Sequence, residues 1–79
     1  MPFRISGYAR SRMRKRGIPL GVVRDVYDDP DGTYTSPEER HGPDREVRWR
    51  RYDGQVVEVV VDLVDGSVVT AWVTRAGAG

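Results

Sequence analysis

The stretch "YARSRMRKRGI" at residues 8–18 gathers cationic side chains that could bind a polyanion. It holds five basic residues and no acidic one. Guanidinium and ammonium groups bind phosphate oxygens, and contacts of this kind position a protein on nucleic acid. Charged residues on a short helix are also commonly found simply facing water. The stretch therefore indicates either a nucleic-acid-binding surface or the solvated face of a helix.

A helical wheel divides these cations into two sets. At about 100° per residue, Ala9 and Met13 define the buried side of the helix, and Arg12 and Arg16 lean toward it. The other cations point to solvent and are candidate nucleic-acid-binding residues: Arg10, Arg14 and Lys15. Arg12 joins this binding set if the partner it needs is a ligand anion.

An inward-leaning guanidinium needs a partner, because a buried charge without one is costly. A carboxylate, a backbone carbonyl or a ligand phosphate would serve. For Arg16 we expect an ion pair, with three candidate carboxylates: Glu46, Glu58 and Asp62. If the partner is instead an RNA phosphate, Arg16 becomes a catalytic residue that stabilises developing charge.

The second basic segment, "RWRRY" at residues 48–52, alternates cations with aromatic rings. Such alternation suits phosphate contacts combined with base stacking, which makes Arg48 and Arg50 candidate nucleic-acid-binding residues. Charged residues equally protect the edge of a β-sheet from pairing with another chain. Both interpretations stay open on the sequence.

Three side chains could transfer a proton in a reaction on RNA. His41, in "ERHGPD", is the only imidazole and could be a general base near neutral pH. Tyr8 and Tyr52 are the other candidates. Alternatively, His41 is an exposed loop residue without a task. The chain has no Cys, no glycine-rich phosphate loop and no cluster with metal-ligand spacing, so we expect neither a metal nor a cofactor.

The composition indicates one small domain that spans residues 1–79. The net charge is only +1, but it is unevenly distributed: residues 1–24 hold seven bases and no acid, and residues 25–39 hold six acids and no base. This arrangement favours a local anion-binding surface over a protein that coats nucleic acid. No apolar run exceeds three residues, so we expect no membrane span and a cytoplasmic location.

The element pattern predicts an α+β fold. Residues 3–6 resemble a short strand, with Ser6 as N-cap of a helix over 7–16 that ends at Gly17. A second helix is expected over 19–28, followed by a polar loop over 28–44 that could include a brief strand at "TYT". Three strands follow, joined by type I′ turns at Asp53-Gly54 and Asp65-Gly66, before a frayed tail at 75–79. Two helices would cover one face of a three- to four-stranded antiparallel sheet.

Two-residue turns fix a register for these strands. They pair Trp49 with Glu58 across the first turn and Val59 with Trp72 across the second. One sheet face would then be apolar yet uncovered by the helices, through Trp49, Val60, Val69, Ala71 and Val73. We expect this face to mediate self-association, as in a dimer, or binding to another protein, unless the register is wrong by one residue.

Much of the chain resembles a bacterial family of domains of unknown function. The segments that carry the resemblance are "ISGYARSRMRKRGIPLGVVRDVYDDPD" and "VVEVVVDLVDGSVVTAWV", roughly residues 3–74 in extent. The helix motif of that family, HARxRMxxRGI, is matched here by Ala9, Arg12, Met13, Arg16, Gly17 and Ile18. Val69, Thr70 and Trp72 match its last strand. The chain departs from the motif where Tyr8 stands in place of the family's His.

This family is similar to the RelE, ParE and BrnT toxins, which share a β-α-α-β-β-β order. The resemblance implies a RelE-like fold and a toxin-like protein of a toxin–antitoxin pair, with an antitoxin-like partner. RelE-like relatives imply a metal-independent endoribonuclease, in which the ribose 2′-hydroxyl attacks the next phosphate. ParE-like relatives imply docking to a protein target instead. A non-catalytic binding module and a homodimeric structural domain are the alternatives, because a fold does not fix a function.

Overall fold

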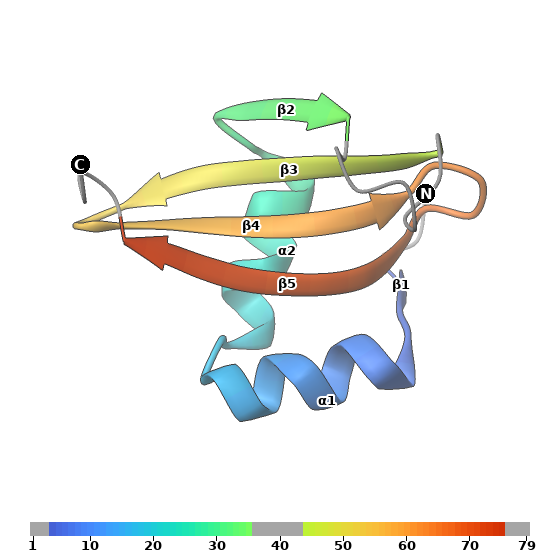
Figure 1. Cartoon of the computed structure of the whole chain (residues 1–79), viewed down its shortest axis with the longest axis horizontal. Helices are drawn as coiled ribbons and strands as arrows, with labels where there is room; N and C mark the ends of the chain where they lie inside the picture. The colour runs from blue at the N-terminus through green and yellow to red at the C-terminus, as the bar shows by residue number, and fades with distance from the viewer. Residues whose placement is uncertain (1–3, 36–43, 76–79) are drawn as a thin grey trace.

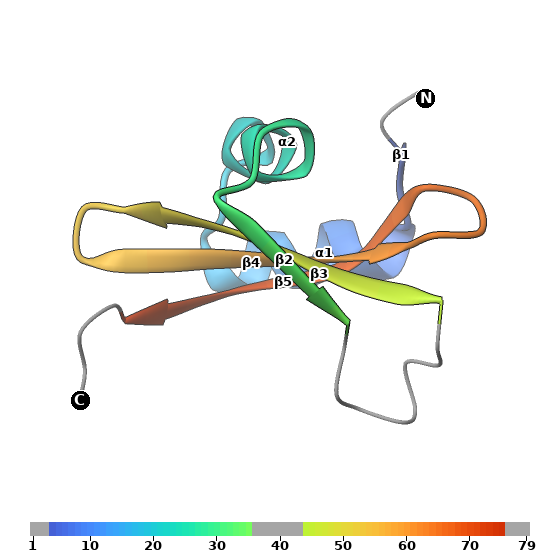
Figure 2. The same ribbon diagram turned by 90° about the horizontal axis from the view of Figure 1, so that it is seen from above.

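In the computed structural model of the chain, residues 4–35 and 44–75 are described. They form an α+β fold with two helices and a five-stranded mixed sheet in the order β1-β5-β4-β3-β2. The elements are β1 (Arg4–Ile5), α1 (Gly7–Arg16), α2 (Leu20–Asp28), β2 (Gly32–Thr35), β3 (Arg45–Tyr52), β4 (Gln55–Asp62) and β5 (Ser67–Arg75). Figures 1 and 2 show α2 crossing one face of the sheet, while α1 runs along its β5 edge.

The sheet has more strands than expected because both short N-terminal segments pair with it. β1 lies parallel to β5, with Ile5 opposite Val68, and β2 lies antiparallel to β3, with Tyr34 opposite Val47. The prediction of an antiparallel sheet is therefore wrong at its β1 edge. The brief strand expected at "TYT" is confirmed as β2.

Helix α1 begins and ends where its local sequence predicts. The Ser6 hydroxyl accepts a hydrogen bond from the Ala9 backbone N–H at 3.0 Å, which satisfies one free donor of the first turn. Gly17 follows the helix in the left-handed region, with φ of 68°. A residue with a side chain would be strained in this conformation, whereas glycine is not.

Helix α2 packs on β4 and β3 through one apolar side. Val23, Val26 and Tyr27 are buried, whereas Leu20 is 48% exposed. Leu20 therefore lies outside the buried side of the helix. Pro19 is the extended residue before the helix rather than its first residue, and the helix ends at Asp28, two residues before Pro30. An ion pair at 3.6 Å joins Arg24 and Asp28, as expected for this spacing.

The turn between β3 and β4 has the predicted length, and the predicted register is confirmed. Trp49 lies opposite Glu58, and Arg51 lies opposite Val56. The turn is not type I′, because only glycines have positive φ in the described residues: Gly54 has φ of 73°, and Asp53 does not. Type I′ needs positive φ at both central residues.

The predicted register between β4 and β5 is wrong. Residues 63–66 form a four-residue loop in place of a two-residue turn, closed by a hydrogen bond of 2.7 Å from the Gly66 N–H to the Asp62 carbonyl. A β-bulge then places one extra residue on β5 opposite the Val60/Val61 step. Beyond the bulge every β5 side chain changes face, because side chains alternate along a strand.

This change of face takes Ala71 and Val73 out of the association surface that the sequence predicted, whereas Trp49 and Val60 stay on it. Ala71 is fully buried in the core between helices and sheet, and Val73 lines a pocket with α2 residues. Trp72 lies on the opposite face, paired with Glu58. Val60 is on that face but is 0% exposed, so it offers no contact area. Association with a second copy or with another protein stays a prediction.

The main core lies between the helices and the central strands. Its members are apolar side chains from both helices, β4 and β5, among them Met13, Val23, Val26, Val59, Val61, Val68 and Ala71. No helix within the described ranges is long and apolar enough to cross a membrane.

Candidate functional site

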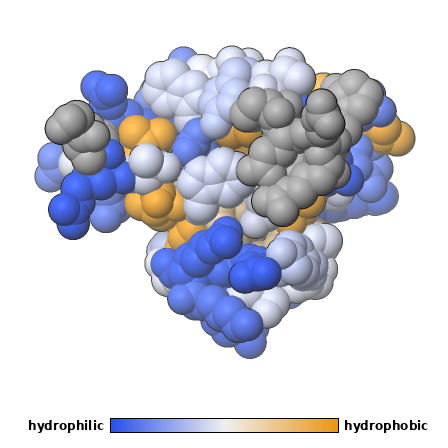
Figure 3. All heavy atoms as spheres, in the orientation of Figure 1, coloured by the Kyte–Doolittle hydropathy of each residue, from blue (hydrophilic) through white to orange (hydrophobic). Residues whose placement is uncertain are grey.

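The outer side of α1 carries three cations. Arg10, Arg14 and Lys15 are exposed. Within residues 4–35 and 44–75 none of the three forms an ion pair, since the acidic groups that pair there do so with other arginines. Figure 3 shows strongly hydrophilic atoms over the part of the surface where α1 lies. The helical wheel predicted that these three cations face solvent, and their exposure agrees with that prediction.

Arg12 finds its partner one turn earlier on the same helix. Its Nε donates a hydrogen bond of 3.0 Å to the Tyr8 hydroxyl, and its guanidinium lies 5.1 Å from the centre of the Tyr8 ring. Tyr8 is itself 60% exposed. Tyr8 thus lies in solvent beside a cation, at the start of the basic surface.

Arg16 binds the backbone of β5 instead of a carboxylate. Its Nη1 donates to the Ala71 carbonyl at 2.6 Å and lies 3.4 Å from the Thr70 hydroxyl. The expected ion pair with Glu46, Glu58 or Asp62 is therefore wrong. Glu58 and Asp62 belong to the sheet face turned away from the helices, and Glu46 pairs with Arg48. The packing of α1 on β5 leaves a carbonyl within the reach of Arg16.

Replacing Arg16 by Ala should destabilise the protein more than replacing Arg14 by Ala. We expect a loss of about 1–2 kcal/mol for Arg16→Ala, because a charge-assisted hydrogen bond to a partly buried carbonyl is lost. Arg14→Ala should change the free energy of unfolding by less than about 0.5 kcal/mol. Urea unfolding followed by circular dichroism would measure both, and equal values would contradict the role given to Arg16.

Arg48 and Arg50 are engaged at the C-terminal end of α2. Arg48 donates to the Tyr27 carbonyl at 2.8 Å and pairs with Glu46 at 2.7 Å. Arg50 donates to the Asp29 carbonyl at 3.0 Å and lies 3.2 Å from its carboxylate. A helix end leaves carbonyls without partners, and cations there bind them. We therefore reassign both arginines from nucleic-acid binding to fixing α2 on β3.

Tyr52 lies away from the α1 cations. Its hydroxyl is buried without a hydrogen-bond partner, and burial raises its pKa, an effect that nearby Arg50 opposes. Its side chain lines a small apolar pocket of about 220 Å³ with Ile18, Val22 and Val73. No described contact joins Tyr52 to Tyr8, and the third candidate, His41, lies outside the described residues. Of the two described candidates, Tyr8 is the one that lies beside the basic surface.

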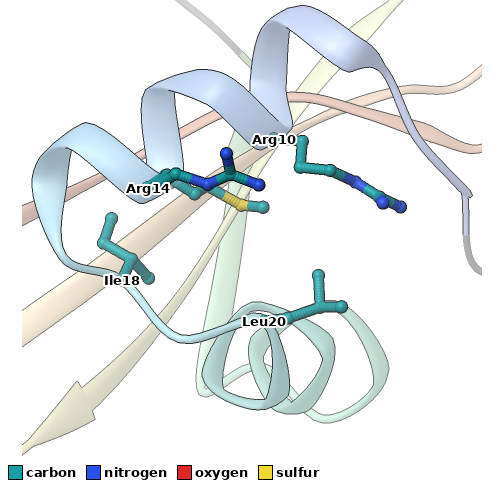
Figure 4. A pocket seen from close by; sticks show the side chains of 5 residues that line it. Arg10, Arg14, Ile18 and Leu20 are labelled. Carbon is teal, nitrogen blue, oxygen red and sulfur yellow. The ribbon is translucent and has the colours of Figure 1, made fainter.

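A pocket between the two helices was not predicted. It has a volume of about 330 Å³ and is lined by Arg10, Met13, Arg14, Ile18 and Leu20. Figure 4 shows the arginines on α1, Leu20 opposite them on α2, and Ile18 in the connection. The apolar "IPL" at residues 18–20 was the only signal in the sequence, and its spacing indicated core rather than a pocket wall.

A second unpredicted cluster lies on the sheet face opposite the helices, here termed the Glu58 cluster: Tyr34, Glu58, Trp72 and Thr74. The Glu58 carboxylate accepts hydrogen bonds from the Trp72 indole at 2.6 Å, from the Thr74 hydroxyl at 2.9 Å and from the Tyr34 hydroxyl. Burial, followed by the hydrogen bond and the charge of Glu58, raises the pKa of Tyr34 to about 12. Three donors from β2 and β5 are thereby joined by one acceptor on β4.

Fold and surface together define a small α+β domain with a cationic helix along one sheet edge. The chain belongs to the family described as domain of unknown function DUF4258, whose model matches residues 5–73. That range includes every helix and all but the ends of the sheet. No curated protein and no solved structure matches the chain significantly.

Proposed function

We propose that this protein is a toxin-like, RelE-like RNA-binding domain that holds RNA on the outer surface of α1. One observation carries the proposal: Arg10, Arg14 and Lys15 are exposed without carboxylate partners in the described residues, next to an exposed Tyr8. Cations bind phosphates, and an exposed aromatic ring can stack on an unpaired base.

The distribution of charge within α1 supports this proposal. Arg10 and Arg14 are four residues apart and so are neighbours on one side of the helix. Like charges at this spacing repel, and the helix has no acidic residue in its first turn to compensate. A polyanion lying along α1 would relieve this repulsion. The net charge of +1 keeps the attraction local to this surface.

RNA binding should depend steeply on salt. We expect the logarithm of the affinity for a single-stranded RNA to fall linearly with the logarithm of salt concentration, with a slope near −0.7 for each phosphate contacted. Arg10→Ala and Arg14→Ala should each reduce this slope by roughly 0.7. Fluorescence anisotropy at salt concentrations from about 50 to about 200 mM would measure this slope.

The matched control for these variants is Arg75→Ala, because Arg75 is exposed at the end of β5 and far along the chain from α1. This variant should keep the slope of the unmodified protein. Binding that is absent, or that is insensitive to salt, would contradict the proposal.

Cleavage of the bound RNA is the second candidate, favoured by the hydrogen bond between Arg12 and Tyr8. In this reaction the ribose 2′-oxygen attacks the adjacent phosphorus, the 5′-oxygen leaves, and a 2′,3′-cyclic phosphate forms. The Tyr8 hydroxyl would donate a proton to the departing 5′-oxygen, water would accept the proton of the 2′-hydroxyl, and the Arg12 guanidinium would stabilise charge on the phosphate.

Tyr8→Phe should lower the cleavage rate by about 10²-fold or more, because general acid–base catalysis typically contributes that much. RNA affinity should change by less than a factor of about 3, since the ring is retained. Gel analysis of an end-labelled RNA would measure the rate. An uncleaved RNA that still binds would show a non-catalytic RNA-binding domain.

A further inference from the structure

We infer that the pocket between α1 and α2 holds one unpaired nucleotide, so that the RNA bound by this domain is single-stranded. The inference rests on the proposed RNA binding and adds the class of RNA and the residues that select it. It starts from the five side chains around the pocket: Arg10, Met13, Arg14, Ile18 and Leu20.

The pocket joins two chemically different surfaces. Arg10 and Arg14 stand on the α1 side with no ion pair in the described part of the chain, and Leu20 faces them from α2 (Figure 4). Met13 and Ile18 are only 3% and 6% exposed and belong to the core. The pocket is therefore cationic at its α1 rim and apolar at its floor and its opposite wall.

A nucleotide likewise has an anionic part and an apolar part. Its phosphate fits a guanidinium, which can form two parallel hydrogen bonds with phosphate oxygens. Its base has an apolar face, which can cover Leu20 and Ile18 or stack on the plane of the second guanidinium. Leu20 is 48% exposed in the free protein, so contact with a base would remove apolar surface from water.

The size and shape of the pocket disfavour other occupants. Ligand pockets commonly measure roughly 300–1,000 Å³, and the value here of about 330 Å³ suits a single small group. An amphipathic helix would need a groove with anchors spaced over at least two turns. A duplex keeps its bases stacked and paired inside, so only its phosphates could reach Arg10 and Arg14.

The lining of the pocket also indicates how strongly it distinguishes one base from another. The side chains around it offer cations and apolar groups and no hydrogen-bond acceptor apart from the Met13 sulfur. Hydrogen bonds to base edges carry sequence recognition, and this set cannot pair with the amino groups of a base. We therefore expect selection for an unpaired base with weak preference among bases.

The test compares a single-stranded oligouridylate with an RNA duplex of equal length. Each RNA carries one fluorophore, and the full chain is titrated into it while anisotropy is measured. Leu20→Ser removes the apolar wall without adding a charge. Its matched control is Leu63→Ser, because Leu63 is 50% exposed in the loop between β4 and β5 and lies outside the pocket. Circular dichroism would verify that both variants are folded.

We expect Leu20→Ser to weaken binding of the single strand by about tenfold, as the loss of a half-buried leucine contact implies. Duplex affinity and both affinities of Leu63→Ser should change by less than about twofold. Unchanged single-strand binding by Leu20→Ser, with the salt dependence intact, would overturn the nucleotide pocket and leave the proposed function standing.

Absence of salt-dependent binding to either RNA would overturn the proposed function and this inference with it. A competition experiment tests for a protein occupant, with a fluorescent single strand as the bound RNA. If an acidic leucine-containing peptide displaces this RNA far better than uridine 5′-monophosphate does, the pocket binds a protein partner and the nucleotide assignment is wrong.

Discussion

Arg48→Ala should lower the free energy of unfolding by about 2–3 kcal/mol. The substitution removes a hydrogen bond of 2.8 Å to the Tyr27 carbonyl and an ion pair of 2.7 Å with Glu46. It also removes a guanidinium that lies 4.6 Å from the centre of the Tyr27 ring. Breaking a fully buried ion pair costs roughly 3–5 kcal/mol. The value is lower here because the Arg48 and Glu46 side chains keep 23% and 27% exposure.

The control for Arg48→Ala is Arg51→Ala on the same strand. Arg51 is exposed, its guanidinium forms no ion pair with a described residue, and its backbone N–H donates to the Asp31 carboxylate. Its removal should cost less than about 0.5 kcal/mol. Urea unfolding would measure stability and anisotropy would measure RNA affinity. A stable Arg48→Ala variant with weakened RNA binding would restore Arg48 to the nucleic-acid-binding set and contradict the structural role.

Glu58→Ala should destabilise the protein by about 2–3 kcal/mol. Three donors on two strands, β2 and β5, lose their acceptor: the Tyr34 hydroxyl, the Trp72 indole and the Thr74 hydroxyl. Hydrogen bonds to a charged group each contribute roughly 1.5–3 kcal/mol, and the exposed position of two of them reduces the sum because water replaces the acceptor. Glu58→Gln keeps one carbonyl oxygen and should lose about half as much.

The same variant should change the response of the protein to alkaline pH. The pKa of Tyr34 is about 12 in the fold against 10.0 for the ordinary side chain, so folding favours its protonated form. This contribution to stability is fully present below about pH 10 and is lost as the pH rises toward 12. Burial is the largest cause of the raised pKa of Tyr34 and persists in Glu58→Ala, but the hydrogen bond and charge of Glu58 are gone, so the pKa should fall below about 12.

Absorbance titration of tyrosinate would measure this fall, with Tyr34→Phe to identify which of the four tyrosines is responsible. The control for stability is Gln55→Ala, an exposed residue at the start of the same strand. If Glu58→Ala unfolds at the same urea concentration as the unmodified protein, solvent satisfies the three donors and the Glu58 cluster contributes no net stability.

The sequence determined those features that depend on neighbouring residues. Both ends of α1 follow from Ser6 and Gly17, which act within one turn of the helix. The register of β3 with β4 follows from the length of the Asp53-Gly54 turn alone. The exposure of Arg10 and Arg14 follows from the period of the helix, because a helical wheel needs no knowledge of what the other side contacts.

Tertiary structure decided the features that depend on distant residues. The β5 register requires a longer loop and a bulge, and no local signal distinguished these from a two-residue turn at Asp65-Gly66. The arginine partners are likewise remote: Arg48 binds a carbonyl 21 residues away, and Arg16 binds one 55 residues away. A backbone carbonyl has the same chemistry at every position, so sequence cannot show which one a guanidinium will reach. The pocket beside Leu20 exists for the same reason, since it is made by the packing of α1 and α2 against one sheet.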